Sequence, residues 1–191
     1  MSKPTLILII ILFLLTGGLL TLALNKSFYS IKEENQPPIS STPTNNPNAP
    51  DTSLLFGDLD VASSSSYPKT YSLPILIKTG TNKVSAVQIE LSFDPGILTN
   101  VSMKPSTFFK SPNVVINKIN TAAGRIYYAL VKTASESAKQ REGTLATLTF
   151  ESQISPFSSV ITFLPRTFVT AEGFDGSALK STNSAKLTIN P

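Results

Sequence analysis

The sequence predicts an all-β domain, a two-layer β-sandwich, behind an apolar N-terminal segment and a proline-rich linker. From residue 53 onward, short apolar runs are separated by clusters of Gly, Pro, Asn and Ser, as strands are by turns. Many of these runs alternate apolar and polar residues, and no long stretch has a helical period. Strands with one apolar face bury it when two sheets pack together, so the nine or ten strands expected here favour a sandwich.

The clearest strand is Val84–Phe93, which ends at a sharp break. Its alternating apolar and polar residues are Val87, Gln88, Ile89, Glu90, Leu91, Ser92 and Phe93. A period of two indicates one buried face. Pro95 in the following Asp94-Pro95-Gly96 pre-sets a turn, and Gly96 can adopt the positive φ of a type II turn. Apolar residues resume at Ile97, too soon for a crossover helix, which indicates a corner between two packed layers.

The other candidate strands have similar patterns. They are Leu54–Val61, Thr70–Lys78, Ile97–Met103, Val114–Ile119, Arg125–Lys132, Thr144–Glu151, Val160–Leu164, Phe168–Thr170 and Ala185–Ile189. Asn120–Gly124 (NTAAG) is predicted to be a hairpin connection. Ser135–Glu142 (SESAKQRE) is rich in helix formers and is interpreted as a short surface helix or a charged loop, with the loop favoured.

The N-terminus contains a candidate membrane segment. Thr5–Leu24 is a run of twenty uncharged residues, and at about 1.5 Å of rise per residue such a helix spans a bilayer core of about 30 Å. The nearest cleavage-like site, Thr21-Leu22-Ala23, is poor, which favours an uncleaved anchor over a long signal peptide. The sequence therefore predicts a single-pass membrane helix that attaches the protein to the membrane.

The next segment is a linker. Asn35–Pro50 has five prolines among Ser, Thr and Asn, and this composition is typical of a semi-rigid spacer. Because such stalks are common at cell surfaces, the domain is expected outside the cell membrane, with a cytosolic tether as the alternative. The predicted division is a signal-anchor helix over residues 1–24, a linker over 25–52 and a β-sandwich domain over 53–191.

The composition argues against catalysis. The chain has no Cys and no His, so thiolate and imidazole metal sites and Ser-His-Asp triads are excluded. No pair of carboxylates is singled out for glycoside hydrolysis. Asp58, Asp60, Glu172 and Asp175 lack the spacing of a calcium loop, and plain turns are favoured there. We expect no catalytic residue, no cofactor and no metal, although a need for calcium in binding stays open.

The charge does not indicate nucleic-acid binding. The formal net charge is +4, from 16 basic and 12 acidic residues. The basic residues are scattered singly and form no Arg-rich stripe. Nucleic acid is therefore not an expected partner.

Four motifs, in order, resemble a cohesin domain. They are LPILIKTG (residues 73–80), VSAVQIELSFDPGILTNVSM (84–103), GRIYYALV (124–131) and GTLATLTFES (143–152). The positions that match the family pattern are Pro74, Phe93-Asp94-Pro95, Ile97-Leu98 and Leu145–Phe150. The resemblance extends over about residues 53–190.

This resemblance implies a nine-stranded jelly-roll sandwich, related in fold to cellulose-binding modules, whose usual task is to bind dockerin modules of other proteins. It also implies a non-catalytic module that recruits a protein partner to the cell envelope. Some cohesins carry a helix where Ser135–Glu142 lies. Only one module is present, and the chain contains no dockerin-like calcium repeat.

One strand gives the candidate binding face. Arg125–Lys132 is apolar on both sides, with Ile126, Tyr128 and Leu130 on one face and Tyr127, Ala129 and Val131 on the other. In cohesins, the sheet that contains the corresponding strands docks the partner. The predicted partner-binding residues are Gln88, Glu90, Tyr127 and Val131, an apolar centre with a polar rim. The alternative is that Ser135–Glu142 covers this face.

Polysaccharide is the competing ligand, because the related modules bind polysaccharides through exposed aromatic rows. The chain has no Trp, which weakens this alternative. Tyr67, Tyr71, Tyr127 and Tyr128 could stack on sugars. However, Tyr127 and Tyr128 are adjacent in a strand and point to opposite faces, so one of them is expected in the core.

Overall fold

The computed structural model describes residues 49–61, 68–152, 154 and 156–189. The predicted membrane helix and the linker up to residue 48 lie outside these ranges. None of the described residues belongs to a helix long and apolar enough to cross a membrane.

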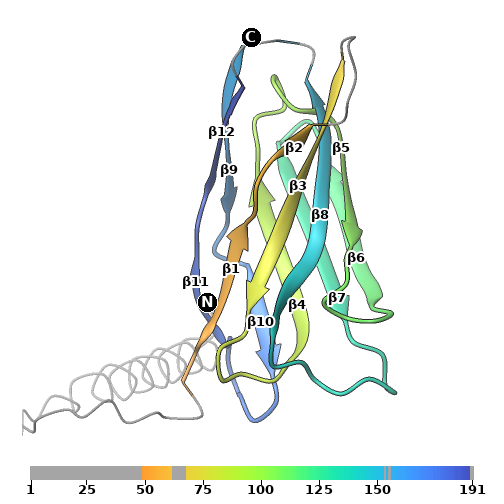
Figure 1. Cartoon of the computed structure of the whole chain (residues 1–191), viewed down its shortest axis with the longest axis vertical. Coiled ribbons are helices and arrows are strands. Elements are labelled where there is room, and N and C mark those ends of the chain that lie inside the picture. Colours follow the sequence, from red (N-terminus) through yellow and green to blue (C-terminus); the bar gives the residue numbers. More distant parts are fainter. Residues whose placement is uncertain (1–48, 62–67, 153, 155, 190–191) are drawn as a thin grey trace, which may run out of the picture. The chain divides into compact units, whose positions relative to one another are not determined.

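Strands make up the regular structure of the described ranges (Figure 1). They are β1 (Thr52–Phe56), β2 (Asp60–Val61), β3 (Lys69–Lys78), β4 (Val84–Ser92), β5 (Thr99–Pro105), β6 (Asn113–Asn120), β7 (Arg125–Val131), β8 (Glu142–Ser152), β9 (Phe157–Phe163), β10 (Phe168–Ala171), β11 (Leu179–Thr182) and β12 (Ala185–Ile189).

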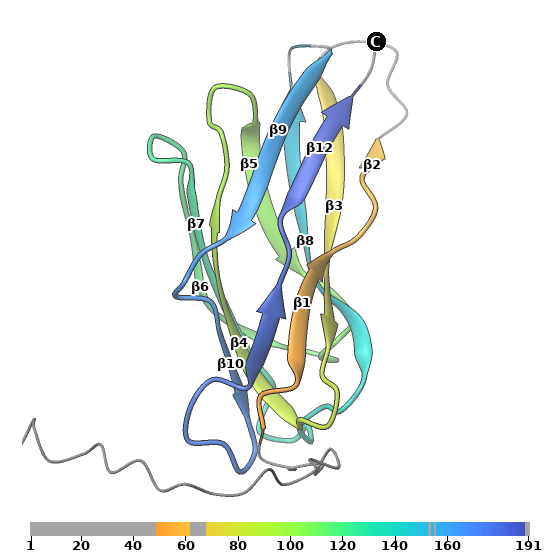
Figure 2. The same ribbon diagram turned by 90° about the vertical axis from the view of Figure 1, so that its left-hand side faces the viewer.

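The strands form two six-stranded sheets, which confirms the predicted β-sandwich. The first sheet has the order β11-β1-β3-β8-β5, with β2 paired to β3; the second has the order β12-β9-β4-β7-β6, with β10 paired to β4. Pairing is antiparallel except between β1 and β11. Figure 2 shows β12 beside β9, on the side of the domain turned toward the viewer. Neighbours far apart in sequence, such as β3 and β8, are thus brought together to bury their apolar faces.

The set of strands differs from the predicted one at two places, besides shifts of one to three residues at several strand ends. Leu54–Val61 is two strands rather than one, because the chain leaves the ladder after Gly57 donates its N–H to Pro74 O (2.8 Å). β11 was not predicted, because its sequence LKST has no apolar alternation and three of its four residues are exposed. It forms through backbone pairing to β1.

The core lies between the sheets and consists of the inward residues of each alternating strand. Its largest fully buried side chains include Tyr71, Tyr128, Phe108, Phe109 and Phe150. The Tyr71 ring stacks on Phe150 with ring centroids 5.5 Å apart and meets Phe157 edge-on. Aromatic pairs in such geometries add to the free energy gained by burying their area.

The break after β4 is a turn, but not of the predicted type. Gly96 does not adopt a positive φ. Instead Asp94 O accepts hydrogen bonds from Ile97 N (3.3 Å) and Leu98 N (2.9 Å), and Asp94 Oδ1 accepts one from Gly96 N (2.8 Å). The segment is therefore one helix-like turn, capped by the Asp94 side chain. It returns Leu98 to the core.

The positive φ at this corner belongs to a glycine of the neighbouring hairpin. Asn120–Gly124 connects β6 to β7 as predicted, and Gly124 has φ +60°. Phe93 N donates to Gly124 O at 2.9 Å. The hairpin thus closes against the end of β4, and the two turns form one unit.

The segment Ser135–Glu142 forms a loop up to Arg141, and Glu142 begins β8, which confirms the favoured loop; the helix that some cohesins carry at this place is absent here. Lys139 exchanges two backbone hydrogen bonds of 2.8 Å with Val84. This pairing holds the backbone extended, which is incompatible with a helix at that position.

The first strand is fixed by residues just before it. Asp51 Oδ2 accepts a hydrogen bond from Thr81 N (3.0 Å), and Asp51 Oδ1 forms an ion pair with Lys180 Nζ (3.2 Å). The backbone N–H of Thr81 and then Lys180 lower the pKa of the Asp51 carboxyl. These contacts join the start of β1 to the β3–β4 turn and to β11.

Candidate functional site

The second sheet presents an outer face whose layout follows from its strand register. Directly paired residues of antiparallel strands point to the same side of a sheet. One row across four strands consists of Phe168 (β10), Gln88 (β4), Ala129 (β7) and Ile116 (β6). The middle of the face is therefore mainly apolar.

Neighbouring rows complete this outer face. On one side lies the row Thr170, Ala86, Val131 and Asn113. On the other side lie the row Glu90, Tyr127 and Lys118 and then the row Thr162, Ser92, Arg125 and Asn120. Polar side chains thus surround an apolar centre, which we call the β10-β4-β7-β6 face.

The inward side of β7 confirms the predicted alternation. Ile126, Tyr128 and Leu130 are buried in the core. Their neighbour on β6, Asn117, donates from Nδ2 to Met103 O (3.2 Å) on β5 of the opposite sheet. Burial raises the pKa of Tyr128 to about 12. Tyr128 is therefore the core member of the adjacent tyrosine pair.

Three of the four predicted binding residues are accessible on the outer face. Tyr127 and Val131 are half-buried, and Gln88 is exposed. The Gln88 side chain is positioned, because its Nε2 donates to Arg166 O at 3.0 Å. These residues lie in three adjacent rows of the face.

Glu90 points outward but is buried, with 7% of its surface exposed, so the expectation that it forms an exposed rim is wrong. The reason is the turn Leu164–Thr167 between β9 and β10. Leu164 N donates to Glu90 O (2.8 Å), and Glu90 N donates to Thr167 Oγ1 (3.2 Å). The turn therefore lies directly beside Glu90 and shields it.

Sequence reasoning did not select two apolar members of the face. Phe168 is 41% exposed and Ile116 is 39% exposed. Both lie in strands that the sequence predicted, but their position beside Gln88 and Ala129 depends on the pairing of β10 with β4 and of β6 with β7. The sequence placed both apolar residues in strands, but only the structure shows that their side chains are exposed.

The β7–β8 loop was the predicted alternative cover for this face. Its contacts run to the end of the sheet: Lys139 pairs with Val84, and Glu136 accepts from Lys110 N (3.0 Å). None of the hydrogen bonds or ion pairs found for the loop among the described residues involves Tyr127 or Ala129. No hydrogen bond or ion pair among the described residues therefore fixes this loop over the centre of the face.

The model of the cohesin domain family matches residues 58–189 of this chain. The chain belongs to the cohesin family. This membership confirms the resemblance drawn from the four motifs, and it agrees with the two-sheet architecture described above.

Solved cohesin structures have the same fold. The solution structure of CaCohA2 from Clostridium acetobutylicum is 21% identical, covers 72% of this chain and 91% of its own, and has a TM-score of 0.52. The third cohesin of ScaC from Acetivibrio cellulolyticus was solved in complex with the ScaB dockerin. It is 15% identical, covers 74% of this chain and 100% of its own, and has a TM-score of 0.55.

An archaeal structure extends this comparison. A non-cellulosomal cohesin from the hyperthermophilic archaeon Archaeoglobus fulgidus is 14% identical, covers 73% of this chain and 91% of its own, and has a TM-score of 0.51. No curated protein matches this chain significantly. At these identities the likeness to solved structures establishes the fold.

The tyrosines of this cohesin do not form a sugar-stacking row in the described ranges. Tyr71 and Tyr128 are core residues, and Tyr127 is half-buried. Tyr67 lies outside the described residues. The polysaccharide alternative therefore gains no support from the positions of these side chains.

The carboxylates considered for calcium are dispersed. Asp58 and Asp60 flank the break between β1 and β2, whereas Glu172 and Asp175 lie in or beside the turn between β10 and β11. Among the residues that the structure describes, no three or more Asp, Glu, His or Cys residues gather as metal ligands.

Proposed function

We propose that this cohesin is a non-catalytic protein-binding module that recruits a dockerin-type partner through its β10-β4-β7-β6 face. The observation that carries the proposal is the second apolar side of β7. A monomeric sandwich needs one apolar face per strand, yet Tyr127, Ala129 and Val131 add another. Ala129 itself is buried, and Tyr127 and Val131, together with Phe168 and Ile116, form an apolar centre that a partner can cover.

The arrangement of polar groups supports a protein ligand. Protein interfaces combine an apolar centre with a polar, solvated rim, and aromatic residues are common anchors. Here Lys118, Arg125, Asn120 and Thr170 lie around Tyr127 and its apolar neighbours. The dockerin complex of the Acetivibrio cellulolyticus cohesin is a precedent for the class of partner.

The partner class can be tested by direct capture. The full chain, immobilised in a neutral detergent, is incubated with purified dockerin modules encoded by the same genome and, in parallel, with insoluble cellulose. We expect saturable retention of a dockerin and none on cellulose. Retention on the polysaccharide alone would favour the sugar-binding alternative instead.

Changing Tyr127 to Ala is expected to weaken binding of such a partner by about 2 kcal/mol or more, roughly thirtyfold, because large aromatic anchors dominate protein interfaces. Isothermal titration calorimetry measures the change. Leu76→Ala is the matched control, since Leu76 is a half-buried apolar residue on β3 of the opposite sheet. Equal losses in the two variants would remove the binding assignment from this face.

We also propose that residues 1–24 anchor the protein in the cell membrane as a single-pass helix, with the cohesin domain outside. The twenty-residue apolar run and the proline-rich linker support this topology. Protease added to intact cells is expected to cut the linker and release the domain. Protection until the cells are lysed would place the domain on the inner side.

A further inference from the structure

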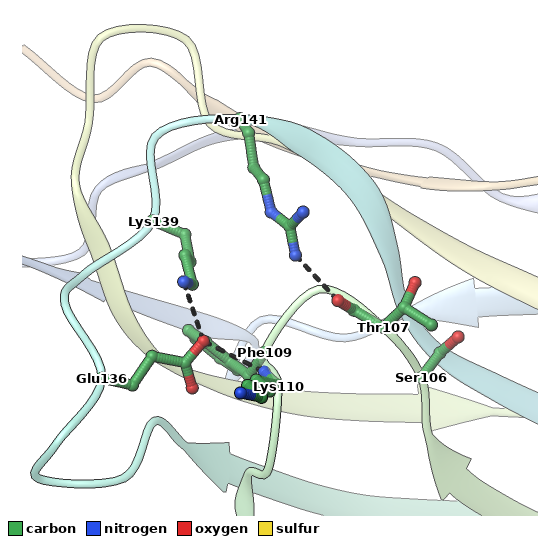
Figure 3. Close-up of a pocket in the computed structure, with 7 residues that line it drawn as sticks. All are labelled: Ser106, Thr107, Phe109, Lys110, Glu136, Lys139 and Arg141. Carbon is green, nitrogen blue, oxygen red and sulfur yellow. Dashed lines mark hydrogen bonds and ion pairs between the residues drawn. The ribbon is translucent and has the colours of Figure 1, made fainter.

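A basic pocket lies at the end of the domain, between the loop that joins β5 to β6 and the loop that joins β7 to β8. It has a volume of about 530 Å³, and Figure 3 shows the side chains that line it. Its lining includes Thr107, Phe109 and Lys110 from the first loop and Glu136, Lys139 and Arg141 from the second. These loops leave the sheet beyond the pair Val131 and Asn113, so the pocket is separate from the central rows of the proposed binding face.

The guanidinium of Arg141 is held in a fixed orientation. Its Nη2 donates to Thr107 O at 2.7 Å and also to Phe108 O, and the group lies 5.6 Å from the centre of the Phe108 ring. Both hydrogen bonds come from Nη2, one of the three nitrogens of the guanidinium. Because Nη2 belongs to both paired edges of the guanidinium, the hydrogens on Nε and Nη1, which have no partner among the described residues, remain only as single donors.

Glu136 neutralises only one of the three cations in the pocket. Its Oε1 accepts hydrogen bonds from Lys139 Nζ (2.9 Å) and Lys110 N (3.0 Å), and its side chain is 8% exposed. Lys139, and then the Lys110 N–H, lower the pKa of this carboxyl, so it stays ionised at neutral pH. Its second oxygen points away from Arg141 in Figure 3.

Two positive charges are therefore left over. The Lys110 ammonium makes no hydrogen bond or ion pair with the described residues, and the Arg141 guanidinium, besides its carbonyl and ring partners, is attracted to the Glu136 carboxylate only at longer range. The nearest further carboxylate in sequence, Glu142, pairs with Lys78 at 3.4 Å. An anion entering the pocket would meet a net attraction beside the buried Phe109 ring.

We propose that this pocket binds an oxyanion, a phosphate or carboxylate group, through the positive charges of Lys110 and Arg141. A guanidinium held in place can donate a single charge-assisted hydrogen bond to an oxygen of either group, and a lysine adds a point charge. The group can come from free phosphate or from an acidic side chain of a protein, and the chemistry of recognition is the same.

The test is a nuclear magnetic resonance titration of the ¹⁵N-labelled full chain in neutral detergent micelles, at constant ionic strength maintained with chloride. One arm uses inorganic phosphate, and the other uses N-acetyl-aspartate N-methylamide as a model of an acidic side chain. We expect saturable shifts confined to the amides around Lys110, Glu136 and Arg141. Saturation with phosphate alone assigns a free anion, and saturation with the aspartate model alone assigns a protein carboxylate.

Lys110→Gln is the decisive variant, because it removes the ammonium and keeps the backbone N–H that Glu136 accepts. Affinity should fall roughly tenfold or more, the effect of losing one charge-assisted hydrogen bond. Arg141→Gln, which removes the second positive charge, should also weaken binding, while Lys186→Gln on β12 should not. Shifts that never saturate, or equal effects of Lys110→Gln and Lys186→Gln, would overturn the proposal.

Discussion

Replacing Tyr128 by Ala is expected to lower the free energy of unfolding by about 3–5 kcal/mol, the range for large aromatic truncations in a core. Tyr128 is 1% exposed and lies on the inward side of β7, paired with Ile89 on β4. Its removal leaves a cavity that the surrounding strands can fill only in part. Urea unfolding of the purified chain, followed by circular dichroism, measures the loss.

Two matched variants separate packing from chemistry at this position. The Tyr128 hydroxyl is buried and has no hydrogen-bond partner among the described residues, so Tyr128→Phe should be neutral or stabilise the fold by about 1 kcal/mol. Tyr127→Ala, on the outward side, should cost clearly less stability than Tyr128→Ala. The opposite order of the two alanine variants would mean that the faces of β7 are exchanged.

The raised pKa of Tyr128 adds a dependence on pH. The phenol titrates near pH 10 in the unfolded chain and near 12 in the fold. Its protonated form is favoured by burial, so this contribution to stability is complete below about pH 10 and is lost as the pH rises toward 12. The unfolding free energy of the Tyr128→Phe variant should fall less steeply over this interval.

Strands and their inward faces could be predicted from the sequence because alternation is a local property. The residues from Val87 to Leu91 show their period without reference to any neighbour, and adjacent tyrosines in one strand must point to opposite faces. The cohesin family could be predicted from the sequence for a similar reason, because its motifs are short runs of residues in a fixed order. These features require no knowledge of how the strands pair.

The accessible surface could not be predicted in the same way. Glu90 is buried because the turn Leu164–Thr167, more than seventy residues away, lies beside it. Phe168 joins the face only through the pairing of β10 with β4. The basic pocket combines Lys110 with Arg141 from a different loop. Each of these features depends on long-range pairing that no local pattern encodes.

The loop Ser135–Glu142 shows a local propensity that tertiary structure overrides. The segment is rich in helix formers, but the backbone of Lys139 pairs with Val84, and the side chain of Glu136 accepts a hydrogen bond from Lys110 N. These contacts fix an extended path. Helix propensity differs by only about 0–0.7 kcal/mol among ordinary residues, so a few such bonds outweigh it.

Gly124→Ala is expected to lower the free energy of unfolding by about 2–5 kcal/mol. A left-handed backbone costs a non-glycine residue about 1–2 kcal/mol, and Gly124 has φ +60°. In addition, an added Cβ would lie 2.2 Å from Phe93 O, so the backbone must move, at a cost of about 1–3 kcal/mol on the scale of overpacked cores. That movement would disturb the hydrogen bond from Phe93 N to Gly124 O and with it the corner that follows β4.

Two other glycines separate the backbone cost of Gly124→Ala from its steric cost. Gly173 has φ +74° with open space around it, so Gly173→Ala carries the backbone cost alone, about 1–2 kcal/mol. Gly176 has neither a positive φ nor a neighbour within 4 Å, and its variant should stay within about 0.5 kcal/mol of the native protein. Urea unfolding of the three variants should therefore rank Gly124→Ala as the least stable, then Gly173→Ala, then Gly176→Ala. If Gly124→Ala lost no more stability than Gly173→Ala, the close approach between the β6–β7 hairpin and the end of β4 would not exist in solution.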